Sequence, residues 1–154
     1  MEHIRQTITF NERNHRKAAL LFIDLDNFKT LNEIYGHAIG GLLLLVIARR
    51  LTGCIREVDI VSRFGGDEFA VLLTNLDELA EEAITQARTA SEKIFNILKQ
   101  PYQLEDQSFT STSSIGIALF DGRETDTDQW LKQADIAMYQ TKKAGRNRFY
   151  FFSE

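Results

Sequence analysis

Cysteine is scarce in this chain, and long apolar runs and an excess of positive charge are missing. Cys54 is the single cysteine, so no internal disulfide can form and a reducing compartment is expected. The 18 Lys and Arg and the 22 Asp and Glu give a net charge of −4, which excludes the basic field that long nucleic acids require. The longest apolar run, Leu42–Ala48, is too short to span a bilayer, and the N-terminus lacks a signal-peptide pattern. These absences predict a cytoplasmic domain without nucleic-acid or membrane contacts.

The composition that remains is that of one globular domain. The chain has 154 residues, of which 44% are apolar and 26% are charged, and it contains no repeat or low-complexity tract. We expect a polar lead-in over residues 1–17 and a folded domain over residues 18–154. The sequence ends on Phe151-Phe152-Ser153-Glu154, which we interpret as a cut between domains.

Apolar periodicity predicts an α/β (α+β) fold, with a mixed central β-sheet flanked by helices. Strands are expected at residues 18–24, 59–64, 68–73, 109–120 and 148–152, and helices at residues 27–35, 42–54, 77–100 and 128–144. Gly36-His37 and Gly40-Gly41 are expected to break the helical region, and Pro101 to end the third helix. Gly116, inside a strand, indicates a bulge or a close backbone approach.

Two carboxylates stand at the end of the first predicted strand. Asp24 and Asp26 are suited to a hard cation such as Mg²⁺, because ligands gather at strand ends in open α/β sheets. The alternative is that Asp26 caps the next helix and Asp24 is solvated.

A second acidic site is the predicted hairpin tip at Gly65-Gly66-Asp67-Glu68. Glycines let the backbone approach a phosphate, while the two acids reach a metal. Two acidic sites on neighbouring strands could share ions, as in phosphoryl transfer. Taken alone, a solvated acidic turn explains the tip equally well.

The tip and its surroundings resemble the GGDEF family of diguanylate cyclases. Residues 65–69 spell the GGDEF signature, and other motifs of the family follow in order and at similar spacing. These are the segment 22–29, Asn32, Tyr35-Gly36-His37, Ser114-Ile115-Gly116, Ala134-Asp135, Met138-Tyr139, Lys142 and Gly145-Arg146-Asn147. The resemblance covers residues 18–152 and implies a palm-like nucleotidyl cyclase fold that condenses two GTP into cyclic di-GMP.

The resemblance also implies roles for individual residues. Asp24, the carbonyl of Leu25 and Glu68 would hold Mg²⁺ (or Mn²⁺), and Asp67 would help with a second ion or activate the attacking 3′-hydroxyl. Gly65 and Gly66 would let the hairpin lie close to the nucleotide. The remaining substrate-binding positions are Phe28, Lys29, Asn32, His37, Lys142 and Arg146, with the cations offsetting the triphosphate charge. Lys142 and Arg146 share a helix face at i, i+4 spacing, although alone they would indicate only a solvated basic face.

An Arg-x-x-Asp motif at Arg56 and Asp59 precedes the hairpin. Such a motif carries little information alone, but in the family it forms an inhibitory site that binds the product.

The chain departs from the family pattern in two places. After Tyr-Gly-His the family has Gly-Asp, whose carboxylate pairs with guanine, but here Gly40-Gly41 stands. A hydrogen bond to a charged group contributes about 1.5–3 kcal/mol. Its loss is expected to weaken GTP binding on the order of 10- to 100-fold and to relax the preference for guanine over adenine. Residues 7–14 match the family's N-terminal segment poorly, so any sensor input is not visible.

Three hypotheses follow from the sequence. The first is a diguanylate cyclase that acts as a homodimer, with each domain presenting one Mg-bound GTP, and with sensor or EAL domains as neighbours in the full-length protein. The second is a degenerate domain that binds GTP or cyclic di-GMP and regulates an attached EAL phosphodiesterase domain. The third is a scaffold without a nucleotide. The acids and Lys142 favour the first, whereas Gly41 favours the second.

Overall fold

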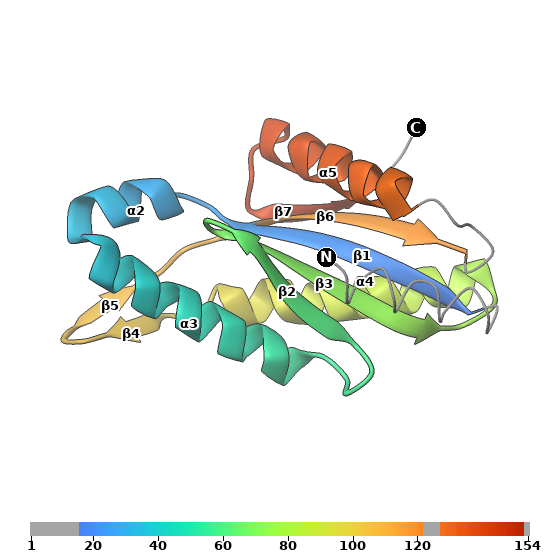
Figure 1. The fold of residues 1–154 in the computed structure, drawn as a ribbon, viewed down its shortest axis with the longest axis horizontal. Coiled ribbons are helices and arrows are strands. Elements are labelled where there is room, and N and C mark those ends of the chain that lie inside the picture. The colour runs from blue at the N-terminus through green and yellow to red at the C-terminus, as the bar shows by residue number, and fades with distance from the viewer. Residues whose placement is uncertain (1–15, 122–126, 153–154) are drawn as a thin grey trace.

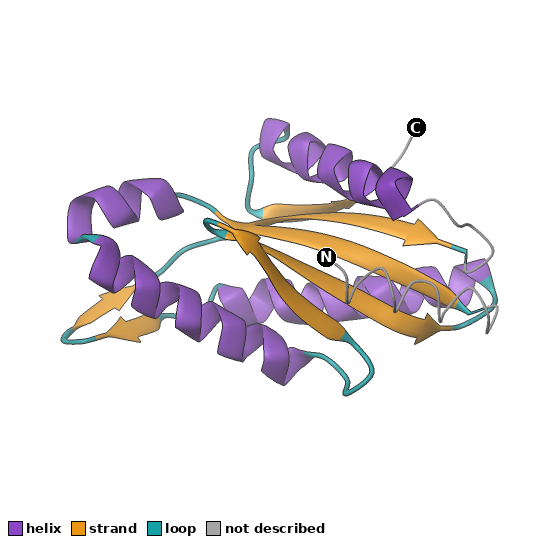
Figure 2. Ribbon diagram, in the orientation of Figure 1, coloured by secondary structure: helices purple, strands orange, loops and turns teal. Residues whose placement is uncertain are grey.

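The computed structural model describes residues 16–121 and 127–152. Within these ranges the strands are β1 (Lys17–Leu25), β2 (Ile60–Gly65), β3 (Glu68–Leu76), β4 (Tyr102–Leu104), β5 (Gln107–Phe109), β6 (Ser113–Phe120) and β7 (Arg148–Phe151). The helices are α2 (Phe28–Tyr35), α3 (His37–Cys54), α4 (Ala80–Leu98) and α5 (Thr127–Lys143). The predicted mixed sheet flanked by helices is confirmed (Figures 1 and 2).

The central sheet has five strands in the order β2-β3-β1-β6-β7. All neighbours are antiparallel except β6 and β7, which run parallel. Helix α5 covers one face of this sheet, and α4 with the end of α3 covers the other (Figure 1). The first strand is central, so both of its faces are buried, as its continuous apolar sequence predicts.

Alternation along the strands separates two apolar cores. Leu21 and Ile23 of β1 face the larger core beneath α3 and α4, whereas Ala18 and Leu20 face the smaller core beneath α5. In the smaller core, Trp130 of α5 stacks on Phe120, with ring centroids 3.7 Å apart. By the same alternation Asp24 faces the α5 side, which decides which helix can reach it.

The structure corrects two predictions about local elements. Helix α3 begins at His37 and runs without interruption through Gly40-Gly41, because packing outweighs the helix-breaking tendency of glycine. The predicted strand 109–120 is shorter, since Phe109 belongs to a separate two-stranded hairpin of β4 and β5. The break at Gly36 and the end of α4 just before Pro101 are confirmed.

Helix α3 is apolar enough, by length and composition alone, to cross a membrane, with a mean hydropathy of 1.3 over its 18 residues. Here Leu43, Ile47 and Leu51 are buried in the larger core. At its C-terminal half, Arg50 donates to the carbonyls of Ile97, Gln100 and Pro101 and lies over the Tyr102 ring. One face of α3 therefore packs within this domain, whereas Leu42 and Leu45 on the helix are exposed.

Gly116 of β6 lies against the backbone of α5. A Cβ built there would stand 2.2 Å from the backbone nitrogen of Met138 and 2.7 Å from the carbonyl oxygen of Ala134. The close backbone approach expected from the sequence is confirmed, and it sets the separation between α5 and the sheet.

We expect Gly116→Ala to lower the free energy of unfolding by about 2–4 kcal/mol, because α5 must move away from the sheet. Urea denaturation measures this loss. Gly53→Ala is the matched control: a Cβ there meets nothing within 4 Å. The control should be neutral or gain up to about 1 kcal/mol of stability from helix propensity. Equal stability of the Gly116→Ala variant and the wild type would contradict the close packing.

Candidate functional site

The buried carboxylate of Asp26 ties the end of β1 to two distant segments. Its Oδ1 accepts from Ser114 Oγ at 2.7 Å, and its Oδ2 accepts from Thr112 Oγ1 at 2.5 Å and from the Asn147 backbone N–H at 3.0 Å. Its own backbone N–H donates to the Thr112 carbonyl at 2.9 Å. Asp26 is 5% exposed, so these bonds compensate for most of its lost hydration. Asp26 therefore does not cap the next helix, and both of its carboxylate oxygens accept hydrogen bonds within the protein. The residue preceding α2 is Asn27, whose side chain makes no capping bond.

The loop between α5 and β7 brings Arg146 to the same edge of the sheet. The Gly145 N–H donates to the Lys142 carbonyl at 3.3 Å and the Arg146 N–H to the Thr141 carbonyl at 3.1 Å, which is a Schellman ending of α5. Gly145, Arg146 and Asn147 all have positive φ angles, at 120°, 60° and 50°. The bond from Asn147 to Asp26 holds this left-handed turn in place.

Asp24 and Asp67 lie together beside a lysine at the end of β1. Lys142 Nζ stands 2.5 Å from Asp24 Oδ2, whereas Asp24 Oδ1 is buried and has no hydrogen-bond partner. Burial raises the pKa of Asp24 to about 6. Lys142 lowers this pKa and the neighbouring Asp67 raises it. Asp24, Asp67 and Lys142 all line one small space at this edge of the sheet.

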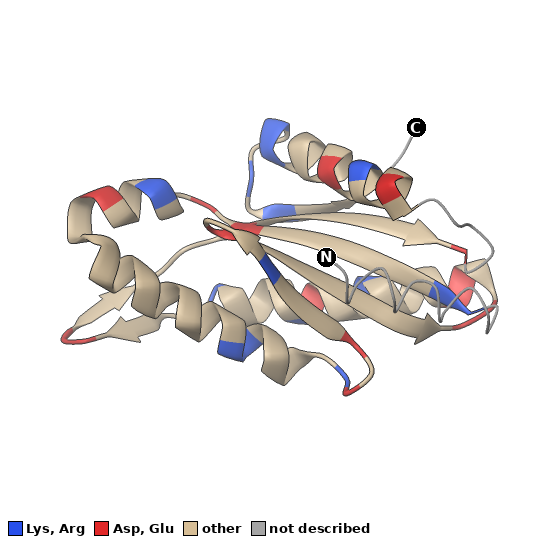
Figure 3. Cartoon of the chain, viewed as in Figure 1, with Lys and Arg blue, Asp and Glu red and all other residues tan. Residues whose placement is uncertain are grey.

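A cavity of about 220 Å³ opens at this point. Its lining joins the predicted residues Asp24, Leu25, Phe28, Lys29, Asp67, Lys142 and Arg146 with Asp26, Asn27 and Thr30. Figure 3 shows the basic end of α5 and the start of β7 close to the acidic end of β1 and the acidic turn between β2 and β3. The cavity thus combines carboxylates for a cation with three cationic side chains for phosphate oxygens.

The residues present fit a magnesium ion that shares its ligands with a bound nucleotide. Nowhere in residues 16–121 and 127–152 do three His, Cys, Asp or Glu side chains converge on a metal position. Mg²⁺ commonly takes only one or two carboxylates and completes its shell with water and substrate phosphates. The unpartnered buried oxygen of Asp24, next to Asp67, meets that requirement.

Glu68 occupies a different position from Asp67. It is the direct cross-strand neighbour of Asp24 in the β1–β3 register, so its side chain lies on the α5 side of the sheet. The residues that line the cavity include Asp67 but not Glu68. Gly65 and Gly66 form the turn before both acids, with φ angles of 100° and 52°, and Arg63 donates twice to the Gly66 carbonyl. The backbone of the tip is thereby fixed.

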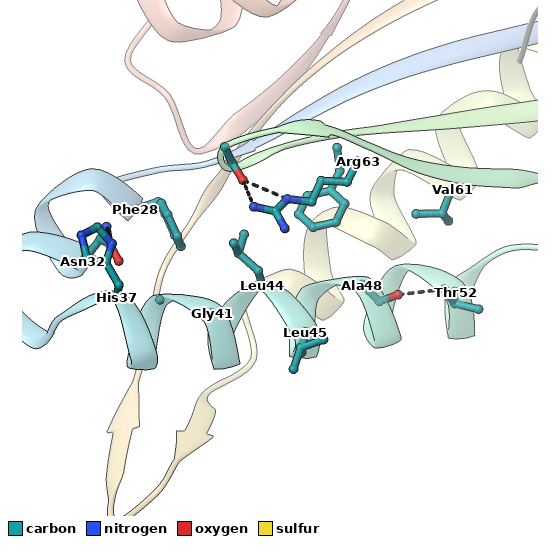
Figure 4. Close-up of a pocket in the computed structure, with 13 residues that line it drawn as sticks. Phe28, Asn32, His37, Gly41, Leu44, Leu45, Ala48, Thr52, Val61 and Arg63 are labelled. Carbon is teal, nitrogen blue, oxygen red and sulfur yellow. Dashed lines mark hydrogen bonds between the residues drawn. The ribbon is translucent and has the colours of Figure 1, made fainter. Parts of the chain in front are cut away.

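A larger groove of about 610 Å³ runs from α2 along α3 to the β2–β3 hairpin (Figure 4). Asn32 and His37 lie side by side at one end, with 3.0 Å between Asn32 Nδ2 and His37 Nδ1. Leu44 points from α3 toward the hairpin. Phe28 lines both this groove and the smaller cavity, so the two spaces are adjacent.

Gly40 and Gly41 have different surroundings in this groove. A Cβ at position 40 would stand 2.2 Å from Asn32 Oδ1, so the absence of a side chain there makes room for Asn32. A Cβ at position 41 would meet nothing within 4 Å. Position 41 therefore faces open space in the groove, and no neighbouring side chain fills the volume of the carboxylate that the sequence lacks.

The Arg-x-x-Asp motif lies at a third site, beside the end of β3. Arg56 donates to both oxygens of Asp59, at 3.1 and 3.0 Å, and also to the Thr74 carbonyl. The Asp59 side chain is 2% exposed and that of Arg56 is 50% exposed. Both residues line a cavity of about 340 Å³ between the end of α3, β3 and α4. Only Arg56 presents substantial surface to a ligand, because Asp59 is committed to the loop.

Comparison with known proteins identifies the family to which this chain belongs. The family model described as "Diguanylate cyclase, GGDEF domain" matches residues 1–148, and the chain belongs to this family. The crystal structure of the GGDEF domain of TpbB from Pseudomonas aeruginosa is similar, with a TM-score of 0.90 and 34% identity over 99% of this chain and 95% of that chain.

Two curated relatives from Pseudomonas aeruginosa are much longer proteins. The bifunctional diguanylate cyclase/cyclic di-GMP phosphodiesterase MucR is 40% identical over 151 residues, which are 98% of this chain and 21% of MucR. The cyclic di-GMP phosphodiesterase NbdA is 35% identical over 135 residues, which are 88% of this chain and 16% of NbdA. The chain thus spans a small part of the curated relatives that it matches.

The position of Asp24 beside Asp67 and Lys142 predicts how its pKa responds to substitution of either neighbour in the metal-free protein. We expect the Asp24 carboxyl to titrate near pH 6. In Asp67→Asn it should titrate lower, because a neighbouring negative charge is removed. In Lys142→Met it should titrate higher, because a positive charge is removed. Carboxyl ¹³C NMR measures all three. Titration of the wild-type group near its ordinary value of 3.8, or shifts of the opposite sign in the variants, would contradict this geometry.

Proposed function

We propose that this domain is a diguanylate cyclase, which condenses two GTP molecules into cyclic di-GMP with Mg²⁺ (or Mn²⁺) as cofactor. The observation that carries the proposal is the convergence of Asp24 and Asp67 with Lys142 and Arg146 at one cavity next to a groove large enough for a base. GTP as substrate also favours the cytoplasm as the location of the domain.

In this proposal each side chain has a defined task. Asp24, the Leu25 carbonyl, Asp67 and Glu68 would hold the cation, which when bound would offset the triphosphate charge. Lys29, Lys142 and Arg146 bind the phosphate oxygens. Lys142, which pairs with Asp24 in this structure, would serve the phosphate oxygens when the carboxylate holds a cation. Phe28, Asn32 and His37 contact the base and sugar.

The reaction needs two domains, because each holds a single nucleotide. In each half, the ribose 3′-oxygen of one GTP forms a bond to the α-phosphorus of the other, and the bond from that phosphorus to the β-phosphate breaks and releases pyrophosphate. In this proposal Asp67 accepts the proton that the 3′-hydroxyl loses. Activity therefore depends on a homodimer and rises faster than linearly with protein concentration.

A second function is favoured by the open space at Gly41 and by the match to NbdA, which is named as a phosphodiesterase. In this alternative the domain binds GTP at the groove, or cyclic di-GMP at the cavity beside Arg56, and regulates a neighbouring EAL or sensor domain. Both functions use the same cation-binding edge for GTP, but only the first forms a product.

We expect concentrated protein incubated with GTP and Mg²⁺ to form cyclic di-GMP, detected by nucleotide chromatography. The Asp67→Ala/Glu68→Ala double variant should form none, because cation binding and proton transfer are both lost. Dilution of the wild type should lower the specific activity.

Absence of product at every protein concentration would contradict the cyclase. Calorimetry then tests the second function. GTP binding lost in Lys142→Met, or cyclic di-GMP binding lost in Arg56→Ala, would support the regulatory domain, whereas no binding of either nucleotide would contradict both functions.

A further inference from the structure

A buried hydroxyl on the last turn of α5 reaches the backbone of the central sheet. Thr141 is fully buried, and its Oγ1 donates to the carbonyl of Ala137, one helical turn earlier, at 2.8 Å. The same Oγ1 stands 3.0 Å from the carbonyl of Ile115 in β6, so the two acceptors share its hydrogen. Threonine often bonds to the preceding turn of its own helix, but such a bond requires no contact with a strand. The second acceptor makes Thr141 a link between α5 and β6.

This link lies beside the closest approach of α5 to the sheet. Gly116 follows Ile115 in β6, and a side chain at this position would collide with the α5 backbone. That contact sets how near α5 comes to the sheet, but it does not by itself stop the helix from sliding along its axis. A hydrogen bond weakens steeply when its length or angle changes. The bond from Thr141 to Ile115 therefore fixes where along β6 the helix lies.

Two cationic residues of the smaller cavity are placed relative to Thr141. Lys142 follows it directly in α5, and its Nζ pairs with Asp24. Arg146 lies in the turn after the helix, and its N–H donates to the Thr141 carbonyl at 3.1 Å. The side chain of Thr141 thus holds the sheet while its carbonyl holds the turn. A shift of Thr141 along β6 would move both cationic side chains together.

The start of β6 supports the cavity through two adjacent residues. Ser114 donates to the buried carboxylate of Asp26, and Ile115 accepts from Thr141. Asp26 in turn accepts from the Asn147 N–H. The turn after α5 is therefore held at one end by Thr141 and at the other by Asp26, and both supports rest on the same strand.

We propose that Thr141 is a positioning residue for the triphosphate, whose hydroxyl sets the place of Lys142 and Arg146 at the smaller cavity. This inference rests on the proposed nucleotide site. Thr141 is not among the residues that line the cavity, so its effect passes through its neighbours. A misplacement of about 1 Å can cost on the order of 100-fold in activity, so a fraction of that shift is enough for a loss of about tenfold.

Calorimetry with Mg²⁺ and 3′-deoxy-GTP, which lacks the attacking hydroxyl, measures binding without turnover. Thr141→Val keeps the shape of the side chain and Thr141→Ala favours the helix. Each should bind the analogue about tenfold more weakly than the wild type. Thr141→Ser restores the hydroxyl and should bind within about threefold of the wild type.

Ile94→Val is the matched control for stability. It removes one buried methyl group from α4, which covers the opposite face of the sheet from α5 (Figure 1). Urea denaturation should show a loss of stability in this variant, whereas its affinity for the analogue should equal that of the wild type. A loss of affinity in Ile94→Val as large as in Thr141→Val would overturn the inference, since lower stability alone would then weaken binding.

A double-mutant cycle with Arg146→Met tests whether Thr141 acts through its neighbours. The loss of affinity caused by Arg146→Met should be at least about threefold smaller in the Thr141→Val background than in the wild type. Additive losses would overturn the inference, as would full affinity in both variants without the hydroxyl, or a loss in Thr141→Ser equal to that in Thr141→Val. Absence of binding by the wild type would instead contradict the nucleotide site, and this inference with it.

Discussion

A buried carboxylate must be fully hydrogen-bonded, and the organisation of this site depends on how Asp26 meets that requirement. Its donors come from the start of β6 and from the turn before β7, which lie 86 to 121 residues away along the chain. The network fixes the end of β1, and with it Asp24, against the segment that carries Lys142 and Arg146. Asp26 thus holds Asp24 and the turn that carries Arg146 at the same edge of the sheet.

The site has two halves that are held differently. The half proposed to bind cation and phosphate is built from strand ends, a Schellman turn and a two-glycine hairpin, so its geometry follows from the backbone. The half proposed to bind the base is a groove along α3 whose character depends on single side chains. Gly41 lines the groove and is not among the residues that line the smaller cavity, so its lack of a side chain alters the second half alone.

Much of the fold could be predicted from the sequence, because β1, β3 and α5 bury long apolar segments with clear periodicity. The β4–β5 hairpin could not, since each strand has three residues and shows no usable alternation. The continuity of α3 through Gly40-Gly41 was mispredicted, because local glycine propensity gave no sign of the packing between Gly40 and Asn32. Most site residues could be named from the family motif. The role of Asp26 could not, since its donors Thr112, Ser114 and Asn147 become neighbours only in the folded chain.

Asp26→Asn tests the central claim most directly, because the amide keeps the shape of the carboxylate but turns a donor toward Ser114, Thr112 or Asn147. The free energy of unfolding and the Mg²⁺-dependent affinity for GTP would be measured on the same preparation. We expect the variant to lose about 2–4 kcal/mol of stability. Its GTP affinity should fall at least about tenfold while it remains folded, since the turn that carries Arg146 loses its anchor. A folded variant that binds GTP as tightly as the wild type would contradict the claim that Asp26 organises the site.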